Sequence, residues 1–471
     1  MYLCGPTVYD DCHIGHVAGP ILFDAVARWL QARGLSVRFV NNITDIDDKI
    51  IQRASDTAEQ WQELTARYTA QYLSYLRQLH VDTITDHPRC SDYIAPMIAY
   101  VAELIAKDRA YVAGDGVYYE VAKQNGYGKL SGRRSEDQLA GARIERESDL
   151  RGPADFCLWK LAKPGEPSWP SPWGAGRPGW HIECSVMSTE LLGRNFDIHA
   201  GGEDLKFPHH ENEIAQAEAH SGCYANCWMH NGLLQYGGRK IGKSDERMKD
   251  PAFREQFRLE RLLAVYGPAT VRFTLLQGHY RRPSDFAPHN LGAQRTALAR
   301  LHKLLGALMQ QSGTATLAEC GQHAAGDGEL QGAFERFCQV MDDDLRTGDA
   351  CAVLFSLAER ARKTGERAAT LLLRDLGRLL GLFLPGDERD TVVANDADPA
   401  LATAMAALLR LRQDARARRD FAVSDRIRDD LAPIGIVIKD AKDGATWEAA
   451  VGGDDGRRLN VVTALVSRLS R

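Results

Sequence analysis

The sequence lacks several features that define large classes of protein. Its 471 residues include no apolar run near the roughly 20 residues that a membrane-spanning helix requires. The N-terminus has no basic segment followed by an apolar one, so we expect no secretory signal, no membrane partner and a cytoplasmic location. Ten widely spaced cysteines are too few for a disulfide scaffold. A net charge of −5 argues against a general nucleic-acid coat protein, although it allows a local basic surface.

The composition that is present indicates an ordinary globular protein of about two to four domains, with 44% hydrophobic and 26% charged residues. The first residues follow a strand–helix–strand pattern. Tyr2 and Leu3 end a short apolar run, residues 21–30 have helical apolar spacing, and residues 36–43 alternate. Gly34 is placed to end the helix. Such a βαβ opening predicts an α/β fold with a parallel sheet covered by helices.

The rest of the sequence divides by composition. Residues 163–180, rich in glycine, proline and tryptophan, are expected to form a structured loop. A polar stretch over 386–399 predicts a linker before a small terminal module. Helical apolar spacing covers residues 57–80, 92–107, 258–276, 290–311, 327–342 and 350–384.

Two histidines lie three residues apart where the first strand leads into the first helix, in Cys12-His13-Ile14-Gly15-His16. At a helix start such a pair faces one side, where backbone N–H groups and the helix dipole attract phosphate. Gly15 lets a ligand approach the backbone closely. The same pair could simply cap the helix, so the motif alone favours neither interpretation.

Two further segments suit a nucleotide. Lys240 and Lys243 lie in a polar loop, where they could neutralise charge as pyrophosphate leaves, although an isolated lysine pair is more often solvated surface. Gly201-Gly202-Glu203-Asp204 follows the apolar run at 196–199, and a glycine pair at a strand end with an acid behind it suits a ribose. The same residues are also common in turns.

A metal site is indicated by His209 and Glu213, because a helix starting after Pro208 puts both on one face. Imidazole and carboxylate suit zinc, and two thiolates would complete a tetrahedral set, but spacing alone does not select them. A polar helix surface is the alternative. A rival and more compact cluster of histidine and cysteine, which fits no common zinc finger, consists of His220, Cys223, Cys227 and His230.

The terminal module carries a basic strip between residues 410 and 428, with arginine at 410, 412, 416, 418, 419, 426 and 428. A strip of this kind suits a phosphate backbone, although a solvated helix with ion pairs such as Asp414–Arg418 is the usual explanation. Trp447 could stack on an unpaired base or close a small core.

These motifs occur together, in the same order along the chain, in the bacterial-type cysteinyl-tRNA synthetases, which the sequence resembles over most of its length. The resemblance extends through Gly278-His-Tyr-Arg281 and residues 420–429. Its most specific part is the tryptophan-rich stretch at residues 169–185. The other matching segments are residues 1–10, His13-Ile-Gly-His16, Asn42-Ile-Thr-Asp-Ile-Asp-Asp-Lys-Ile50 and Phe207-Pro-His-His-Glu-Asn-Glu-Ile-Ala-Gln216.

The resemblance implies a class I synthetase, a cysteine–tRNA ligase that activates L-cysteine with ATP and loads it onto tRNA(Cys), and we expect a monomer. It implies a Rossmann-type parallel-sheet catalytic domain with an inserted connective domain, a helical bundle and a small anticodon-binding module. We expect the catalytic halves at 1–108 and 179–257, the connective region at 109–178, the bundle at 258–386, the linker at 387–398 and the C-terminal module at 399–471.

The resemblance also implies roles for residues. One Zn²⁺ would be held by Cys4, Cys184, His209 and Glu213, with His210 outside the set. Thr44, Trp180 and His199 would surround the cysteine substrate, and Arg426 and Trp447 would contact tRNA. ATP, with Mg²⁺ on its phosphates, would be bound by His13, His16, Gly202, Asp204, Lys240 and Lys243.

Zinc would explain how cysteine is selected. Cysteine differs from serine by one atom, and a pocket that measures only size discriminates such substrates by perhaps 10–200-fold. Zinc binds a thiolate more strongly than a hydroxyl, and a coordinated thiol loses its proton.

Two features depart from the family. Ile241 and Gly242 replace the methionine and serine of the usual Lys-Met-Ser-Lys-Ser loop, although both lysines are kept. Relatives carry roughly 20 more residues before the strand that leads to Cys4, so we expect a short first strand. One alternative function is a cysteine ligase acting on a small amine, as in the mycothiol pathway, against which the basic terminal module argues. Another is a catalytically silent paralogue that only binds tRNA, against which the histidines and lysines argue.

Overall fold

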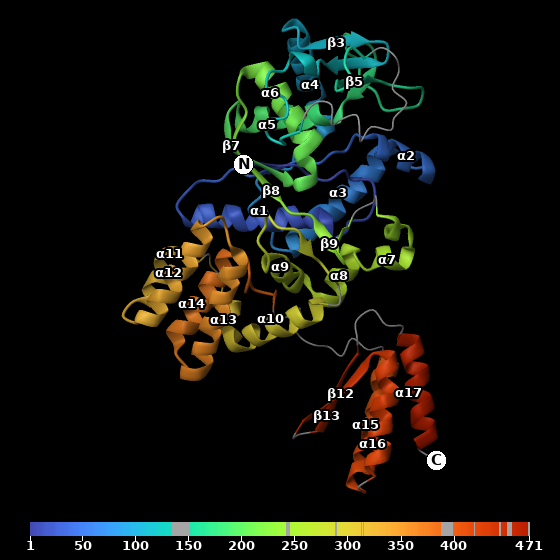
Figure 1. Ribbon diagram of the computed structural model, residues 1–471, viewed down its shortest axis with the longest axis vertical. Helices are drawn as coiled ribbons and strands as arrows, with labels where there is room; N and C mark the ends of the chain where they lie inside the picture. The colour runs from blue at the N-terminus through green and yellow to red at the C-terminus, as the bar shows by residue number, and fades with distance from the viewer. Residues whose placement is uncertain are drawn as a thin grey trace.

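The centre of the molecule is a four-stranded parallel sheet (Figure 1). The computed structural model describes residues 1–133, 150–241, 245–287, 290–311, 313, 315–387, 399–418, 420–441, 444–449 and 455–469. The strand order is β2–β1–β7–β8, and every neighbouring pair is parallel. These strands are β1 (Tyr2–Leu3), β2 (Val40–Asn41), β7 (Phe196–Gly202) and β8 (Ala225–Asn231). The predicted parallel α/β fold is therefore confirmed.

The strand order reverses at β1, because β2 pairs on one side of it and β7 on the other. Helices packed beside the sheet occupy the connections between its strands. In open α/β sheets, ligands bind in the crevice beyond the carboxyl ends of the strands at such a reversal. The helices of this part are α1 (Ile14–Ala32), α2 (Asp48–Thr57), α3 (Trp61–Gln78), α4 (Ile94–Ala106), α5 (Trp180–Leu192) and α6 (Glu211–Ser221).

The first helix forms as its sequence predicts. His13 caps its N-terminus, and Gly34, just after the C-cap Arg33, has the left-handed φ of +85° that glycine adopts without strain. The strand predicted at 36–43 is mostly wrong. Only Val40 and Asn41 pair with β1, because β1 offers two residues to pair with, and Ile43 forms an isolated bridge with Arg89.

A separate antiparallel sheet lies between the two halves of the parallel sheet in sequence, and at the top of Figure 1. Its strands are β3 (Ala110–Ala113), β4 (Gly116–Tyr119), β5 (Phe156–Leu161) and β6 (Gly176–Pro178). The predicted loop at 163–180 is mostly irregular, but its last residues form β6 and begin α5. Pro178 is tolerated in β6 because β6 is an edge strand.

Helices dominate after residue 250, as the apolar spacing predicts. Gly267 (φ +79°) divides the pattern at 258–276 into two helices, and Gly365 (φ +68°) ends the helix that begins at Thr347. These helices are α7 (Pro251–Glu255), α8 (Leu259–Tyr266), α9 (Pro268–Leu276), α10 (Leu291–Leu305), α11 (Leu317–Ala324), α12 (Gly328–Asp342), α13 (Thr347–Thr364) and α14 (Arg367–Leu379). A small sheet consists of β9 (Leu234–Tyr236), β10 (Arg239–Lys240) and β11 (Ser284–Asp285). In sequence, β9 and β10 precede α7, and β11 lies between α9 and α10.

A buried charge cluster fastens α1 to this helical part. Asp24 on α1 is fully buried and accepts hydrogen bonds from Arg28 Nε at 2.7 Å and from the Arg272 guanidinium on α9. Arg272, 1% exposed, also donates to the carbonyl oxygens of Leu79 and Leu380, at 3.1 Å and 2.9 Å. The buried ions are compensated by partners from separate elements, so the cluster fixes α3, α9 and α14 against α1.

The C-terminal module has its own apolar core, which includes Leu408, Ile427 and Val462. Of the arginines in the predicted basic strip, Arg412 is only 1% exposed and so cannot belong to an exposed surface, whereas Arg416 and Arg426 are exposed. The module consists of α15 (Pro399–Ala417), α16 (Phe421–Leu431), β12 (Ile436–Ala441), β13 (Gly444–Ala449) and α17 (Asp455–Leu469).

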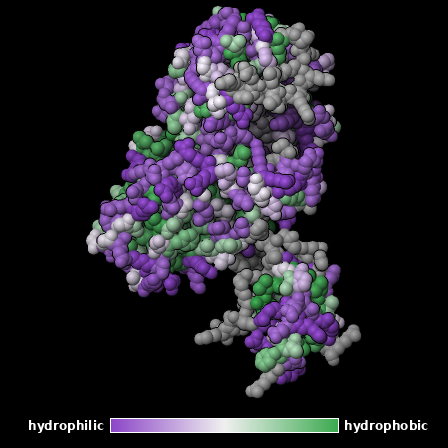
Figure 2. Space-filling model, viewed as in Figure 1, coloured by the Kyte–Doolittle hydropathy of each residue, from purple (hydrophilic) through white to green (hydrophobic). Residues whose placement is uncertain are grey.

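The surface carries no broad apolar area on the face shown in Figure 2, which is mostly hydrophilic with small, separate hydrophobic groups. Within the described residues, no helix is both long and apolar enough to cross a membrane.

Candidate active site and metal centre

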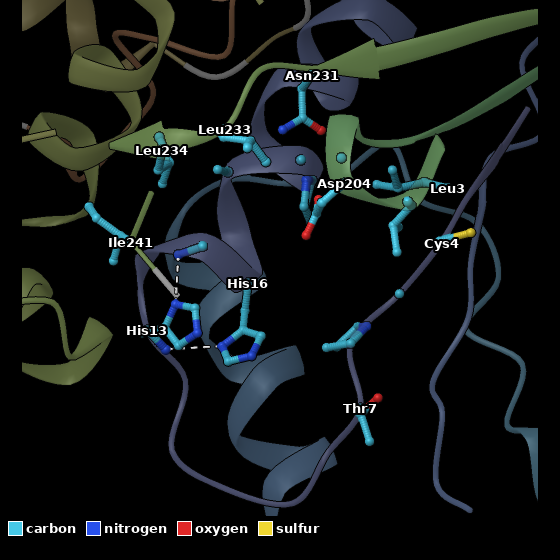
Figure 3. Close-up of a pocket in the computed structure, with 18 of the residues that line it drawn as sticks. Leu3, Cys4, Thr7, His13, His16, Asp204, Asn231, Leu233, Leu234 and Ile241 are labelled. Atoms are coloured by element: carbon cyan, nitrogen blue, oxygen red, sulfur yellow. Dashed lines mark hydrogen bonds between the residues drawn. The ribbon is translucent and has the colours of Figure 1, made fainter. Parts of the chain in front are cut away.

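A cavity of about 450 Å³ lies beyond the carboxyl ends of the central strands (Figure 3). Five of the six residues expected at ATP line it, and the sixth, Lys243, lies outside the described residues. Thr7, Lys49 and Asn231 also line the cavity and had not been singled out from the sequence. The five expected residues are His13, His16, Gly202, Asp204 and Lys240.

His13 and His16 both cap the helix and line the cavity, so helix capping and ligand binding are compatible interpretations of the motif. His13 Nδ1 accepts from the backbone N–H of Gly15 at 3.0 Å, and His16 Nδ1 accepts from the N–H of His13 at 3.0 Å. Burial lowers the pKa of His13 to about 4 and that of His16 as well, so both rings are neutral near pH 7. A neutral ring that accepts at Nδ1 carries its proton on Nε2. Each ring therefore offers one N–H donor to a ligand.

Gly15 leaves no room for a side chain beside these rings. A Cβ at this position would lie 2.7 Å from His13 Cε1, which is closer than a real Cβ contact allows. The cap conformation of His13 therefore requires glycine two residues later.

Asp204 and Lys240 face each other at the cavity. Lys240 Nζ lies 2.8 Å from Asp204 Oδ2, and both side chains are partly exposed. The pair joins the segment after β7 to β10. A ligand that uses either group must compete with a solvated ion pair, which stabilises a protein by only about 0–1 kcal/mol.

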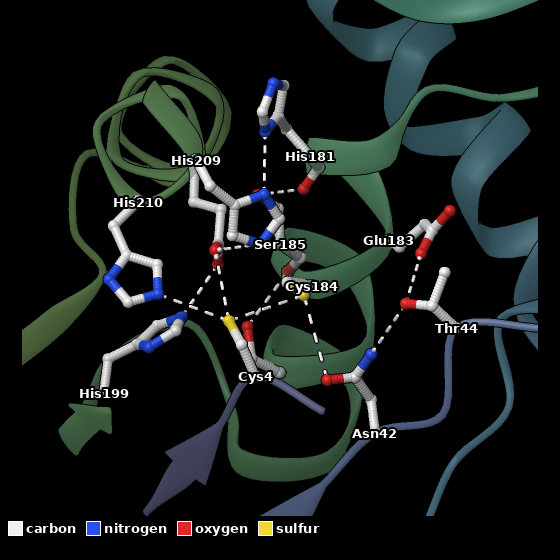
Figure 4. Close-up of polar contacts among 12 residues, drawn as sticks. Cys4, Asn42, Thr44, His181, Glu183, Cys184, Ser185, His199, His209 and His210 are labelled. Carbon is white, nitrogen blue, oxygen red and sulfur yellow. Dashed lines mark hydrogen bonds and ion pairs between the residues drawn. The ribbon is translucent and has the colours of Figure 1, made fainter. Parts of the chain in front are cut away.

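Beside this cavity, which Cys4 also lines, four donor groups from distant parts of the chain meet. Figure 4 shows the sulfurs of Cys4 and Cys184 close together, with His209 beside them. The Sγ atoms of Cys4 and Cys184 are 3.8 Å apart, and Cys4 Sγ lies 3.7 Å from Glu213 Oε1. His209 Nε2 lies 3.1 Å from the same oxygen. The donor atoms of these four residues all lie within 4.8 Å of one another.

These separations can be compared with the edges of a zinc tetrahedron. Zinc–sulfur bonds of about 2.3 Å place two sulfurs about 3.8 Å apart, and shorter bonds to nitrogen and oxygen place those atoms about 3.3 Å apart. The Cys4–Cys184 and His209–Glu213 separations, 3.8 Å and 3.1 Å, are close to these values. These two separations are therefore compatible with zinc, and all the donor atoms of the set lie within 4.8 Å of one another.

The electrostatics around the four donors favour a cation. Burial raises the pKa of the Cys4 thiol well above its usual value, and the nearby Cys184 and Glu213 raise it further. Burial also lowers the pKa of His209, assisted by the neighbouring rings of His181 and His199. A divalent cation would reverse the preference of the thiols, since it binds thiolates, and it would bind the imidazole of His209 in the neutral form that burial already favours.

Neighbouring side chains fix the second carboxylate oxygen of Glu213, Oε2. This oxygen accepts from the Tyr224 hydroxyl at 2.8 Å and lies 2.8 Å from His199 Nε2. His209 is oriented in a similar way, since its Nδ1 lies 2.8 Å from His181 Nδ1. Partners of this kind fix the direction in which a metal ligand presents its donor atom.

A second donor set overlaps the first. It consists of Cys4, His199, His210 and Glu213, and it includes the histidine that the sequence prediction left out. His210 Nε2 lies 3.3 Å from Cys4 Sγ, and its Nδ1 lies 2.9 Å from His230 Nε2.

The rival cluster is not assembled. Neither metal-compatible group found among the described residues contains Cys223, Cys227 or His220. Instead, Cys227 is exposed, and His220 stacks on Tyr100 at 3.8 Å between ring centroids.

The residues expected at the cysteine substrate surround the metal centre. Trp180 begins α5, is 42% exposed and stacks on His209 with ring centroids 4.2 Å apart. His199 contacts Glu213, as described above. Thr44 is buried and donates to Glu183 Oε2 at 3.1 Å.

Glu183 and Cys90 form a buried pair that the sequence had not indicated. The Cys90 thiol donates to Glu183 Oε2 at 2.8 Å, and both side chains are almost completely buried. Burial raises the pKa of the Glu183 carboxyl well above its usual value. Only its place next to Cys184 in the sequence could have drawn attention to Glu183.

The residues expected at tRNA lie in the C-terminal module. Arg426 is an exposed residue of α16. Trp447 is on β13, opposite Ile438 of β12, and packs partly buried against the core of the module.

Comparison with known proteins decides the family. The family described as "tRNA synthetases class I (C) catalytic domain" matches residues 1–296, a "Cysteinyl-tRNA ligase anticodon binding domain" matches 398–447 and a "DALR domain" matches 336–384. A cysteine–tRNA ligase of Azotobacter vinelandii is 47% identical over 455 residues, covering 95% of this chain and 94% of its own. One of Pseudomonas paraeruginosa is 45% identical over 457 residues, covering 96% and 95%. The chain belongs to the cysteine–tRNA ligases.

Solved structures confirm the class I fold of this ligase. A Mycobacterium tuberculosis methionyl-tRNA synthetase in complex with methionyl-adenylate superposes with a TM-score of 0.55 at 14% identity, covering 83% of this chain and 92% of its own. The LeuRS of an Agrobacterium radiobacter ternary complex gives 0.54 at 13% identity, covering 83% and 84%.

Proposed function

We propose that this cysteine–tRNA ligase selects its amino acid through a zinc ion held by Cys4, Cys184, His209 and Glu213. The observation that carries the proposal is the agreement between the donor separations and the edges of a zinc tetrahedron. This set is favoured over the one with His199 and His210 because it supplies two thiolates, which zinc binds well. The bound zinc would supply a preference for a thiolate over a hydroxyl, which shape alone does not provide.

The neighbours of the donors support this assignment. Since Tyr224 and His199 occupy Glu213 Oε2, the carboxylate presents Oε1 toward Cys4 and His209. His199 is thereby committed to holding Glu213 and is less available as a ligand itself. Thr44, Trp180 and His199 are the candidates for contacting the rest of the amino acid.

The cavity is proposed to bind ATP. His13 and His16 would donate their Nε2–H groups to phosphate oxygens without carrying a charge, at the N-terminus of α1, where the helix dipole favours anions. Asp204 would accept from the ribose hydroxyls, which requires its ion pair with Lys240 to open. Lys240 would then be free for the phosphates, together with Mg²⁺ and Lys243.

The reaction follows from this placement. The carboxylate of cysteine attacks the α-phosphate of ATP, pyrophosphate leaves, and cysteinyl-adenylate forms. A terminal ribose hydroxyl of tRNA then takes the acyl group and AMP leaves. The protein contributes position and charge stabilisation rather than a nucleophile of its own. Arg426 and Trp447 are the proposed tRNA contacts in the anticodon-binding module.

Two assays test the proposal. ATP–pyrophosphate exchange that depends on cysteine, but not serine, is expected of the zinc-loaded chain, and labelled cysteine is expected to appear on tRNA. Exchange without tRNA charging would instead support a ligase that acts on a small amine. Absence of exchange would support a paralogue that only binds tRNA. Loss of both zinc and exchange in Cys184→Ser is expected.

A further inference from the structure

The helix α6, which carries Glu213 and begins just after His209, is contacted by a segment from the antiparallel sheet region. We call residues 124–133, which follow β4, the strap. Glu211, at the start of α6, is 1% exposed and accepts from the backbone N–H groups of Leu130 and Ser131 through Oε2, at 3.2 Å and 2.9 Å. A buried carboxylate that receives two backbone hydrogen bonds fixes the strap and the helix relative to each other.

The strap contacts α6 along its length. The Tyr127 hydroxyl donates to Asn212 Oδ1, and Gln124 Nε2 donates to Glu218 Oε2 at 3.1 Å. Lys129 forms an ion pair with the same Glu218. At the end of the strap, the Arg133 guanidinium lies 5.2 Å from the ring centroid of Phe207, two residues before His209.

The two carboxylates that contact the strap, Glu211 and Glu218, lie on a different face of α6 from Glu213. Glu211 and Glu218 are seven residues apart and so share one face, while Glu213 follows Glu211 by two residues and points about 200° around the helix. A small shift or rotation of α6 would move Glu213 away from Cys4, which belongs to another element. The position of the donors therefore depends on what holds α6 from outside.

We propose that Glu211 is a positioning residue for the metal centre, acting through the strap to keep His209 and Glu213 in register with Cys4 and Cys184. This inference rests on the proposed zinc function. It also gives the connective region a role, because the strap holds the proposed zinc site in place. Loss of an interaction that orients metal ligands commonly weakens metal binding by about 10–100-fold.

The first test is zinc release from the purified holoenzyme to a chromophoric chelator. Glu211→Ala is expected to accelerate release by about 10-fold or more. Glu211→Gln is expected to release zinc nearly as slowly as the wild type, because its amide oxygen can still accept both N–H groups. The ratio of cysteine to serine activation should fall in Glu211→Ala and recover in Glu211→Gln.

Asp155 offers a matched control. It is also a buried carboxylate of the connective region and accepts from the backbone N–H groups of Val121 and Gly152, at 2.9 Å and 2.8 Å. Its third partner is the hydroxyl of Tyr111, so these contacts stay within the connective region and do not involve α6. Asp155→Ala should destabilise the region without changing zinc release. Equal acceleration in Asp155→Ala and Glu211→Ala, or no acceleration in Glu211→Ala, would overturn the proposal.

A second measurement needs no variant and so does not depend on the folding of Glu211→Ala. Because coupling between two sites is reciprocal, zinc removal should loosen the strap. The amides of Leu130 and Ser131 are expected to exchange hydrogen faster in the metal-free wild type than in the zinc-loaded one. Unchanged exchange contradicts the positioning role. A wild type that binds no zinc contradicts the proposed function itself, whereas zinc-loaded protein insensitive to Glu211→Ala contradicts only this inference.

Discussion

Single side chains in this enzyme serve the fold and the ligand with different atoms. His13 and His16 use Nδ1 to cap α1 and leave Nε2 for the cavity. Glu213 gives Oε2 to Tyr224 and His199 and leaves Oε1 for the metal centre. A substitution at such a residue therefore removes a structural and a chemical contribution together, and its effects must be measured separately.

Stability should depend on pH through His13. Burial lowers its pKa from 6.5 to about 4, so in that interval the unfolded chain binds more protons than the folded one. The contribution of His13 to stability is complete above pH 6.5 and is lost as the pH falls from 6.5 toward 4. In His13→Asn, the decline of unfolding free energy over this range should be shallower, by up to roughly one proton. Urea unfolding curves at several pH values check this, and equal slopes in both proteins contradict it.

The thiol ligands can be tested against the rival cluster. Cys4→Ser should lower the zinc content of the purified protein from about one ion per chain to near zero, because a buried hydroxyl is a poor zinc ligand. Cys227→Ser should keep its zinc, since Cys227 is exposed and outside both donor sets. Atomic absorption on the two variants gives the comparison. Zinc lost from Cys227→Ser and kept in Cys4→Ser would reverse the assignment.

Residue chemistry sets a limit on what the sequence could predict about the site. The pairing of His209 with Glu213 follows from helical spacing alone. Cys4 and Cys184 are 180 residues apart, so only the fold, or resemblance to a family, could bring them together. Tyr224 carried no signal in the sequence, because its role depends on a contact with the far oxygen of Glu213.

At the scale of elements, α1 connects the cavity to the helices that follow residue 250. Its N-terminus lines the cavity proposed to bind ATP, and its interior carries Asp24, which meets Arg272 of α9. Its C-terminal turn is held by Asp342 of α12, whose Oδ1 accepts from Trp29 Nε1 at 3.1 Å and from Arg33 Nε at 3.0 Å. The helix therefore links the cavity to the helical bundle.

Removing one member of the buried Asp24–Arg272 ion pair should lower the free energy of unfolding. Arg272→Met leaves Asp24 as a buried carboxylate with Arg28 as its one charged partner, and removal of one member of a buried pair commonly costs about 3–5 kcal/mol. The double variant Asp24→Asn, Arg272→Met should recover part of this loss because no charge is then stranded. Urea unfolding followed by circular dichroism measures both. A single variant as stable as the wild type would show that the cluster does not fasten the helices.

Helices were more predictable than strands for a physical reason. The helical spacing predicted at 57–80 and 92–107 is local, and the structure has α3 at 61–78 and α4 at 94–106 within these ranges. The strand predicted at 36–43 is largely wrong because pairing depends on a distant partner, and β1 offers only two residues. The helix α11 was missed, since its eight residues are too few to show a clear period.

At the scale of the whole molecule, the proposed sites for amino-acid activation and tRNA recognition lie in different parts of the chain. The candidate metal centre and the cavity lie within residues 3–241. The C-terminal module has a separate core and carries the exposed arginines of α15 and α16. The two activities should therefore be separable.

Removal of the C-terminal module tests this division. A chain ending at Asp387 should keep cysteine-dependent ATP–pyrophosphate exchange and lose most tRNA charging, since the proposed anticodon contacts are gone. Trp447→Ala in the full chain should lower kcat/KM for tRNA by about 10- to 100-fold, as expected from the loss of about 1–3 kcal/mol of stacking, and leave exchange unchanged. Equal losses of both activities in Trp447→Ala would mean that this residue serves only the core of the module.

The central claim is a bond between the sulfur of the substrate and a zinc ion in this centre, and X-ray absorption at the zinc edge measures it directly. The zinc-loaded enzyme alone should show two sulfur neighbours at about 2.3 Å. Saturating cysteine should raise the number to three, while serine should leave it at two. A sulfur count that stays at two with cysteine bound would contradict the account.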